Sequence, residues 1–142
     1  MFVIFDLDGT LADIEHRRHM ISDGKKDWPG FFRACVDDAP IIPVLNTYSM
    51  FKHAGHRVEI WSGRSDIVQD ASNTWLTTHL GEKTAVTRMR AERDYQPDDQ
   101  LKESWLLSLE QKPDLVFDDR QKVVDMWRRH GIVCAQVAPG NF

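Results

Sequence analysis

The hydrophobic positions of this chain follow two alternating patterns. Short, nearly continuous apolar runs rich in strand formers predict buried β-strands at residues 2–5, 57–61, 86–89, 115–117 and 132–137. Between them, apolar residues spaced three or four apart predict helices from Pro43 to Gly55, from Ser65 to Gly81, over 101–109 and from 123 to Gly131. Strands that alternate with helices are typical of βαβ units, so we expect an α/β fold with a parallel central sheet.

The segment from Asp13 to Pro40 follows neither pattern. It is polar, has no clear period, and contains Trp28-Pro29-Gly30. One interpretation is a small cap inserted over the carboxyl edge of the sheet, and the other is a plain surface excursion. The chain of 142 residues fits a single domain, in which residues 13–40 are too few to form a second one. A cap of this size would leave a site open to a bulky substrate.

Composition narrows the functional classes. Charged residues make up 28% and hydrophobic residues 42% of the chain, as is usual for soluble proteins, and the net charge of −4 argues against a protein that coats nucleic acid. Two cysteines, Cys35 and Cys134, are too few for a disulfide framework, and the first residues lack the basic start of a signal peptide. No apolar run approaches the roughly 20 residues of a membrane span, so we expect a cytoplasmic protein with free thiols.

The first predicted strand ends in a pair of carboxylates. Asp6 and Asp8 lie two residues apart, so on an extended chain they point to the same side, and Gly9 permits a sharp turn after them. The carboxyl ends of parallel strands share one edge of the sheet, where open α/β folds bind ligands. The same edge should carry Ser62-Gly63-Arg64 and Asp118-Asp119, which follow two further strands, and Lys102, which has Asp98 four residues before it.

Electrostatics limits what such a site can be. Like charges about 4 Å apart repel by about 4 kcal/mol at a moderate effective dielectric, so four aspartates cannot all stay ionised there without compensation. A hard divalent cation with oxygen ligands supplies it, and Mg²⁺ suits a site that also holds phosphate. Lys102 and Arg64 could then bind phosphate oxygens, the arginine bidentately, and Ser62 adds a neutral donor.

These residues resemble the four motifs of the haloacid dehalogenase (HAD) superfamily of phosphatases. The motifs are Asp6-x-Asp8-Gly9-Thr10, Ser62, Lys102 and Asp118-Asp119, in that order. More specifically, the chain is similar to the 3′-phosphatase domain of phage-type polynucleotide kinase, through Ser62-Gly63-Arg64, Arg88-Met89-Arg90, Asp98-x-x-x-Lys102-Glu103, Phe117-Asp118-Asp119-Arg120, the tail Gln136-Val137-x-x-Gly140-x-Phe142, and Arg17 after the first motif. The resemblance implies a Rossmann-like three-layer α/β/α fold with a small cap.

The resemblance also implies a role for each residue. Asp6 is the nucleophile that forms an aspartyl-phosphate, and Asp8 protonates the leaving oxygen and then activates water. Ser62 and Lys102 bind the transferring phosphoryl group. The metal ligands are Asp6, the backbone carbonyl of Asp8, and Asp118, with Asp119 in support. The substrate-binding set comprises Thr10, Arg17, Gly63, Arg64 and Asp98, of which Asp98 orients Lys102.

Several residues have two interpretations. Arg17 and Arg64 either contact substrate phosphate beyond the reacting group or form surface ion pairs of little energetic value. The same two interpretations apply to Arg88, Arg90 and Arg120. Trp28, in the insertion, is the one tryptophan outside the predicted core faces, and it either stacks on a base or packs within the insertion.

The leading hypothesis is a Mg²⁺-dependent phosphomonoesterase that removes 3′-phosphates from DNA or RNA ends. The alternatives are a phosphatase of small nucleotides or metabolites, which the acidic net charge favours, and a non-catalytic phosphate-binding module, against which Asp6 and Asp8 argue. The sequence has no Gly-x-x-x-x-Gly-Lys-Ser/Thr loop, so we expect no kinase activity, and a separate kinase or ligase could act beside the protein.

Overall fold

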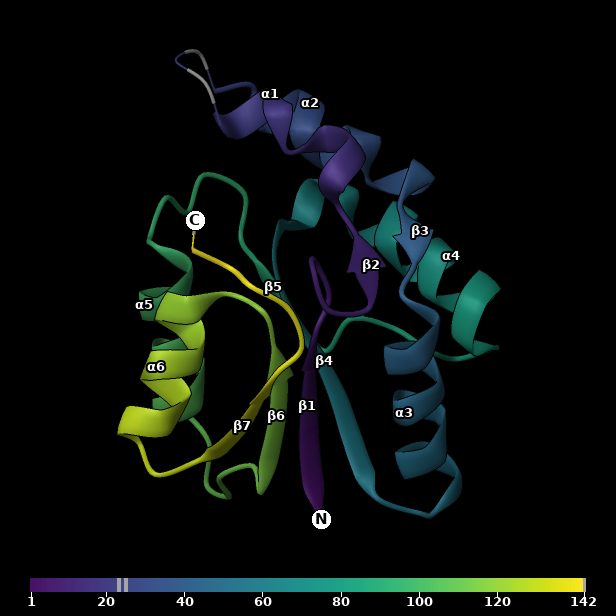
Figure 1. Ribbon diagram of the computed structural model, residues 1–142, viewed down its shortest axis with the longest axis vertical. Coiled ribbons are helices and arrows are strands. Elements are labelled where there is room, and N and C mark those ends of the chain that lie inside the picture. Colours follow the sequence, from purple (N-terminus) through teal and green to yellow (C-terminus); the bar gives the residue numbers. More distant parts are fainter. Residues whose placement is uncertain (23, 25, 142) are drawn as a thin grey trace.

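The computed structural model describes residues 1–22, 24 and 26–141, and its centre is a five-stranded sheet of order β5-β4-β1-β6-β7. The strands are β1 (Phe2–Asp6), β4 (Arg57–Ser65), β5 (Arg88–Arg90), β6 (Leu115–Asp118) and β7 (Val133–Gln136). Each neighbouring pair is parallel, with β1 between β4 and β6 (Figure 1). Phe142, the last residue of the tail motif, lies outside the described residues.

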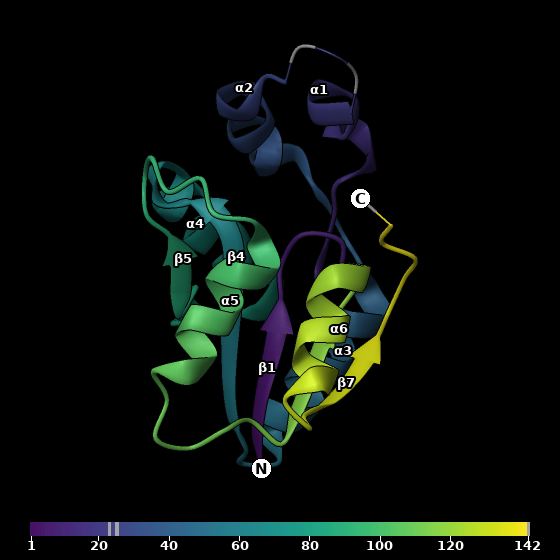
Figure 2. The same ribbon diagram turned by 90° about the vertical axis from the view of Figure 1, so that its left-hand side faces the viewer.

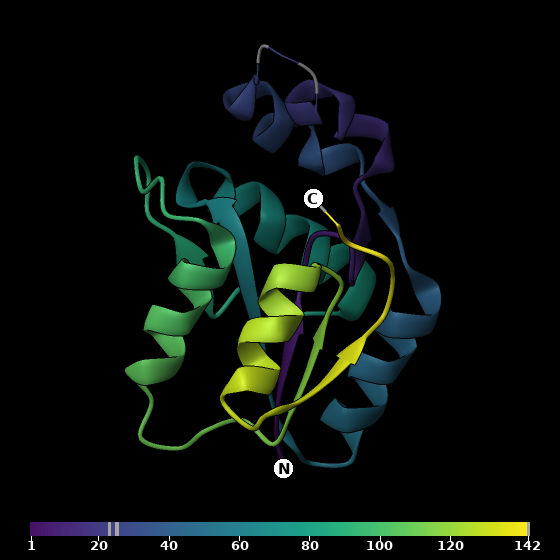
Figure 3. The ribbon, with the colours of Figure 1, turned by 60° about the vertical axis from the view of Figure 1, so that its left-hand side comes forward.

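Helices cover both faces of this sheet, which explains the continuous apolar run of β1. Val3 and Phe5 point to one face, in a core shared with helices α3 (Ile42–His53) and α4 (Gln69–Leu80). Phe2 and Ile4 point to the other, in a core shared with α5 (Asp98–Leu107) and α6 (Gln121–Arg129). Figures 1 and 3 show the two helix layers on either side of the sheet. The predicted three-layer α/β/α architecture is confirmed.

The boundaries around β4 differ from the prediction. The strand does not end at Trp61 but continues through Ser62 and Gly63 to Ser65, where its pairing with β5 shifts register. Ser65 begins the next helical segment as predicted, because its Oγ accepts the N–H of Ile67, but this segment opens with a short 3₁₀ turn, η3 (Asp66–Val68), before α4. Arg64 therefore lies within the strand, and its side chain is buried. A strand that ended at Trp61 would have left Arg64 in a loop.

Residues 13–40 lie over the carboxyl edge of the sheet (Figures 1 and 2). They leave and return through an antiparallel pair, β2 (Ala12–Asp13) and β3 (Ala39–Pro40). Between the two strands lie η1 (Glu15–Arg17), α1 (His19–Ser22), α2 (Trp28–Arg33) and η2 (Ala34–Asp37). Such short elements have too few turns to produce a hydrophobic period. The part of the chain that the structure describes contains no helix with the length and apolar character needed to span a bilayer.

Candidate active site

Four charged side chains from three elements meet at the carboxyl edge of the sheet. Asp6 ends β1, Asp118 ends β6 with Asp119 directly after it, and Lys102 projects from α5. The Lys102 ammonium donates to Asp6 Oδ1 at 2.7 Å and to Asp118 Oδ2 at 3.0 Å. Lys102 is 1% exposed, so these bonds form in a dry environment where charge–charge interactions are strong.

The site holds more negative charge than Lys102 can offset. Oxygens of Asp6, Asp118 and Asp119 all lie within 4.8 Å of one another. Burial raises the pKa of Asp6 well above its usual range, and the neighbouring carboxylates of Asp118 and Asp119 raise it further against the opposing effect of Lys102. Burial and Asp118 raise the pKa of Asp119 to about 7. A divalent cation would relieve this excess, and an all-oxygen donor set suits Mg²⁺.

The loop after β1 is tight because it must bring the backbone close to these acids. The carbonyl of Leu7 accepts the N–H groups of Thr10, Leu11 and Ala12 at 3.3, 3.0 and 2.9 Å. Gly9 has φ +80°, a conformation that side chains rarely adopt, and a Cβ there would overlap the Asp119 carboxylate. Two independent constraints therefore require glycine at this position of the first motif.

Asp8 faces a different set of charges. Its Oδ1 accepts from Arg17 Nη2 at 2.9 Å and from Arg64 Nε at 2.8 Å. Although burial alone would raise the pKa of Asp8, Arg64 and Arg17 lower it below its usual value. The two aspartates of the motif thus have opposite pKa shifts, an arrangement that separates their chemical roles.

The same two arginines also bind Asp38, which sequence reasoning did not single out. Arg17 holds Asp38 through two parallel bonds of 2.7 Å, and Arg64 Nη2 lies 2.8 Å from the same carboxylate. Arg64 additionally donates to Ser72 at 2.9 Å. Both arginine side chains and Asp38 have 0% side-chain exposure. Asp38 thus locks the guanidiniums that hold Asp8, and it ties residues 13–40 to the sheet.

The remaining predicted residues surround this centre at different depths. Thr10 donates to Asp6 Oδ2 at 3.3 Å, and the fully buried Ser62 accepts the N–H of Arg64 at 3.2 Å. Asp98 accepts from Arg90 at 3.1 Å and lies 3.9 Å from Lys102. Gly63 lines the cavity, and a Cβ on it would overlap Asp98.

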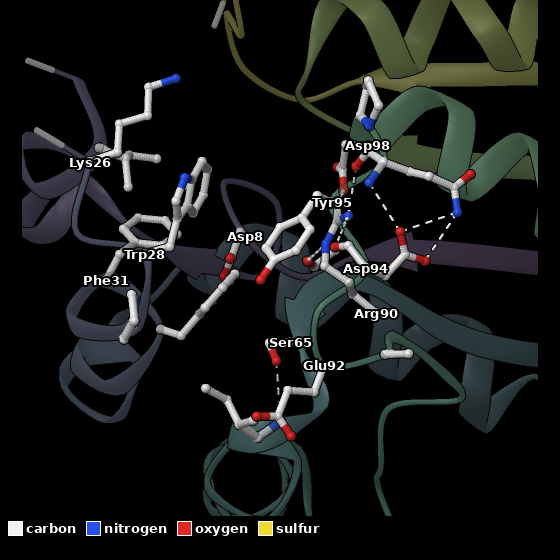
Figure 4. A pocket seen from close by; sticks show the side chains of 18 of the residues that line it. Asp8, Lys26, Trp28, Phe31, Ser65, Arg90, Glu92, Asp94, Tyr95 and Asp98 are labelled. Carbon is white, nitrogen blue, oxygen red and sulfur yellow. Dashed lines mark hydrogen bonds and ion pairs between the residues drawn. The ribbon is translucent and has the colours of Figure 1, made fainter. Parts of the chain in front are cut away.

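The site opens into a cavity of about 670 Å³. Asp6, Asp8 and Asp119 belong to its lining. One wall comes from residues 13–40, including Trp28 and Phe31, and the other from residues 90–98 (Figure 4). Arg17, Arg64, Lys102 and Ser62 are not among the lining residues, and all four are buried. The cavity therefore presents the aspartates to a ligand, while the buried cations that bind them lie behind.

The layered parallel sheet, with its acid pair at the end of the first strand, is the HAD-like fold. Solved structures with low identity share this fold, among them the class C acid phosphatase from Bacillus anthracis with tungstate bound, at 16% identity and a TM-score of 0.65, over 98% of this chain and 66% of that one. A phosphoserine phosphatase phospho-aspartyl intermediate analogue also matches, at 16% identity and a TM-score of 0.52, over 97% and 87%.

A more specific likeness covers the whole chain. The family model for the polynucleotide kinase PNKP phosphatase domain matches residues 1–142, so the chain belongs to that family of phosphatase domains. A chain of the Pnkp1/Rnl/Hen1 RNA repair complex is 30% identical with a TM-score of 0.80, over 99% of this chain and 43% of that one. A second structure of a Pnkp1/Rnl/Hen1 complex gives 31% and 0.81, over 99% and 46%. This chain thus spans less than half the length of those chains.

Proposed function

We propose that this domain is a Mg²⁺-dependent phosphomonoesterase that removes 3′-phosphates from nucleic-acid ends through an aspartyl-phosphate. The observation that carries the proposal is the buried cluster of Asp6, Asp118 and Asp119 around Lys102, open to a cavity at the edge of the sheet. The family match supports the phosphatase chemistry, and the likeness to chains of an RNA repair complex supports the substrate class.

The reaction would proceed in two displacements. A carboxylate oxygen of Asp6 attacks phosphorus while the bond from phosphorus to the leaving oxygen breaks, and Asp8 gives that oxygen a proton. Asp8 then takes a proton from water, whose oxygen attacks the aspartyl-phosphate and regenerates Asp6. By the resemblance, Lys102 and Ser62 would stabilise the equatorial oxygens of the transferring group, and Lys102 lies next to the attacking carboxylate, 2.7 Å from Asp6 Oδ1. Mg²⁺, held by Asp6, Asp118 and the carbonyl of Asp8 with support from Asp119, would supply charge neutralisation for the same group.

Arg17 and Arg64 fit a role as positioning residues for Asp8. Their side chains have no exposed surface, and their ion pairs are with Asp8 and Asp38. They keep Asp8 ionised in the free enzyme, which is the form that activates water. The negative charge of an arriving phosphate favours protonation of Asp8, which is the form that serves the leaving oxygen. This assignment differs from direct contact with substrate phosphate, which their placement does not favour.

Replacing Arg64 by alanine is therefore expected to lower kcat/KM by about 10²–10³-fold on every phosphomonoester, since the defect lies in general acid–base chemistry. Steady-state kinetics on a 3′-phosphorylated oligonucleotide and on an aryl phosphate would give equal losses. Arg64→Lys, which cannot reproduce the forked contacts, should recover little activity. A loss confined to the oligonucleotide would assign Arg64 to substrate recognition instead.

The substrate class is tested by phosphate release with Mg²⁺ from matched oligonucleotides that carry either a 3′- or a 5′-phosphate, in DNA and RNA form. We expect at least a 10-fold preference for the 3′-phosphate. Free 3′- and 5′-mononucleotides serve as the comparison, because the net charge of −4 favours a small substrate as the second candidate function. Preference for mononucleotides, or equal turnover of both ends, would move the domain to nucleotide metabolism.

We also propose that the domain acts beside a kinase or a ligase in end repair. The support for this proposal is the likeness of the domain to a chain of the Pnkp1/Rnl/Hen1 RNA repair complex. The free, buried thiols of Cys35 and Cys134 are compatible with a reducing, cytoplasmic setting. Co-purification of the domain with a ligase or kinase from its source cells would support this proposal.

A further inference from the structure

The cavity above the acidic cluster has an exposed aromatic side chain on each wall. Trp28, in α2, is 41% exposed, and Tyr95, in the loop between β5 and α5, is 88% exposed. Both line the cavity that also contains Asp6 and Asp8, and Figure 4 shows them within this one space. Aromatic rings left open to water beside a catalytic centre are candidates for contact with the substrate.

The loop that carries Tyr95 is held in a defined conformation. Arg90 Nη1 donates to the carbonyls of Asp94 and Gln96 at 3.1 and 2.6 Å, on either side of Tyr95. The same guanidinium donates to the carbonyl of Gly63 at 2.7 Å and to Asp98 at 3.1 Å. Arg90 therefore braces the loop against β4 and α5. The structure favours neither of the two interpretations, substrate-phosphate contact and surface ion pair, because the guanidinium binds three backbone carbonyls and Asp98.

Tyr95 itself takes no part in this bracing. Within the described residues, no hydrogen bond or ring contact involves its side chain, and Figure 4 shows the ring in the cavity. The turn that precedes it contains Arg93 in a left-handed conformation, with φ 66°. Such backbone conformations are retained where the surrounding structure over-determines them, often at ligand sites. The loop therefore exposes a tyrosine ring that contributes no hydrogen bond or ring contact to the described part of the fold.

Trp28 on the opposite wall is supported from behind. Its ring lies 5.7 Å from that of Phe31 in an edge-on contact and 5.8 Å from that of Phe32. Phe31 in turn packs under the Arg17 guanidinium at 4.3 Å, and its carbonyl accepts from Arg17 at 3.1 Å. Since Arg17 holds Asp8, the aromatic wall is connected to the chemical centre through two contacts.

We propose that Trp28 and Tyr95 form a stacking site for a nucleobase at the single-stranded 3′ end of the substrate. The inference rests on the proposed function and adds to it that the end must be unpaired, because a base can stack on side chains only when it leaves its own duplex. Lys26 and Arg93 line the same cavity and could contact the backbone phosphates of the strand. The cavity volume of about 670 Å³ is in the range that accommodates ligands larger than a phosphate group.

The net charge of the protein supports binding through base stacking on Trp28 and Tyr95. With a net charge of −4, the chain lacks the overall basic field that would hold a polynucleotide without base contacts. Stacking on aromatic rings tolerates any base, since every base has a π face. The site would therefore recognise a strand end without reading its sequence.

The experiment compares kcat/KM for a single-stranded 3′-phosphorylated oligonucleotide with that for the same oligonucleotide lacking the bases of its last two nucleotides. For the wild-type protein we expect at least a 10-fold advantage of the intact strand, and a similar advantage over a fully paired blunt end. Trp28→Ala and Tyr95→Ala should each lose about 5- to 50-fold on the intact strand and less than 2-fold on the abasic one. Tyr95→Phe, which keeps the ring, should behave as the wild type, as should Leu107→Ala, exposed at the end of α5.

The outcomes separate this inference from the proposed function. If the wild-type protein releases 3′-phosphate equally well from intact and abasic strands, or if the alanine variants lose activity equally on both, the stacking site is refuted while the 3′-phosphatase function stands. If the wild-type protein does not act on 3′-phosphorylated strands at all, the stacking site and the proposed 3′-phosphatase function are both refuted. Circular dichroism of the variants establishes that the fold is retained, as expected for side chains on the cavity surface.

Discussion

Asp6→Asn is expected to abolish phosphate release, with a loss on the order of 10⁴-fold or more. Asparagine has the same size and could keep most contacts of the site, but its amide cannot attack phosphorus to form a stable phosphoenzyme. The loss should appear in kcat on every substrate, because the step removed is common to all of them. Steady-state phosphate release, followed for hours at high protein concentration, measures it.

The same substitution should leave the fold intact and raise its stability in metal-free buffer. Burial and the nearby carboxylates raise the pKa of Asp6, so its ionised form opposes folding at neutral pH, and a neutral isostere removes that opposition. Lys102 retains its bond to Asp118. Asp70→Asn, an exposed position in the first turn of α4, is the matched control; it should leave activity unchanged and lower the melting temperature only slightly, through the lost interaction with the helix dipole. Substantial residual turnover by Asp6→Asn would show that another group is the nucleophile.

The sequence predicted the parts of this structure that depend on short-range pattern. The β1 run is apolar at every position because both faces of the strand are covered, and the parallel arrangement then places the residues after each strand at one edge. The structure does bring Asp6, Lys102, Asp118 and Asp119 together there. The sequence could predict which residues follow the strands and that these residues share one edge of the sheet, because this requires only local hydrophobicity and the parallel pairing of α/β folds.

The parts that the sequence did not reveal depend on contacts between distant segments. Asp38 lies in a polar stretch and resembles any exposed acid, yet it is buried because Arg17 and Arg64 converge on it from 21 and 26 residues away. Arg90 resembles a phosphate ligand, but it binds backbone carbonyls, which carry no sequence signal. A charged residue's partner is decided by tertiary packing, so charge pattern alone could not separate substrate contacts from structural ones.

Removal of divalent metal is expected to reduce turnover by at least about 10³-fold, and addition of Mg²⁺ should restore it. The physical reason is the excess of negative charge at the end of β1, which Lys102 only partly offsets. Mg²⁺ at 100 times its dissociation constant would stabilise the folded state by about 2.7 kcal/mol if it binds only that state, a rise in melting temperature on the order of 10 °C. Thermal melts with EDTA and with Mg²⁺, beside activity in the same buffers, measure both effects.

The pH dependence of these melts distinguishes a cation that fills the acidic cluster from one bound elsewhere. The pKa of Asp119 is about 7 in the folded protein against 3.8 ordinarily, so between these values the folded state binds the extra proton. The contribution of Asp119 to the stability of the metal-free protein therefore falls as pH rises from 4 through about 7, and we expect the melting temperature to fall with it. Mg²⁺ competes with that proton, so it should stabilise most above pH 7 and flatten the dependence. Asp119→Asn should weaken the dependence without metal, whereas Asp70→Asn should keep it, and a metal-free melting temperature that rises over this interval would contradict the excess-charge account of the site.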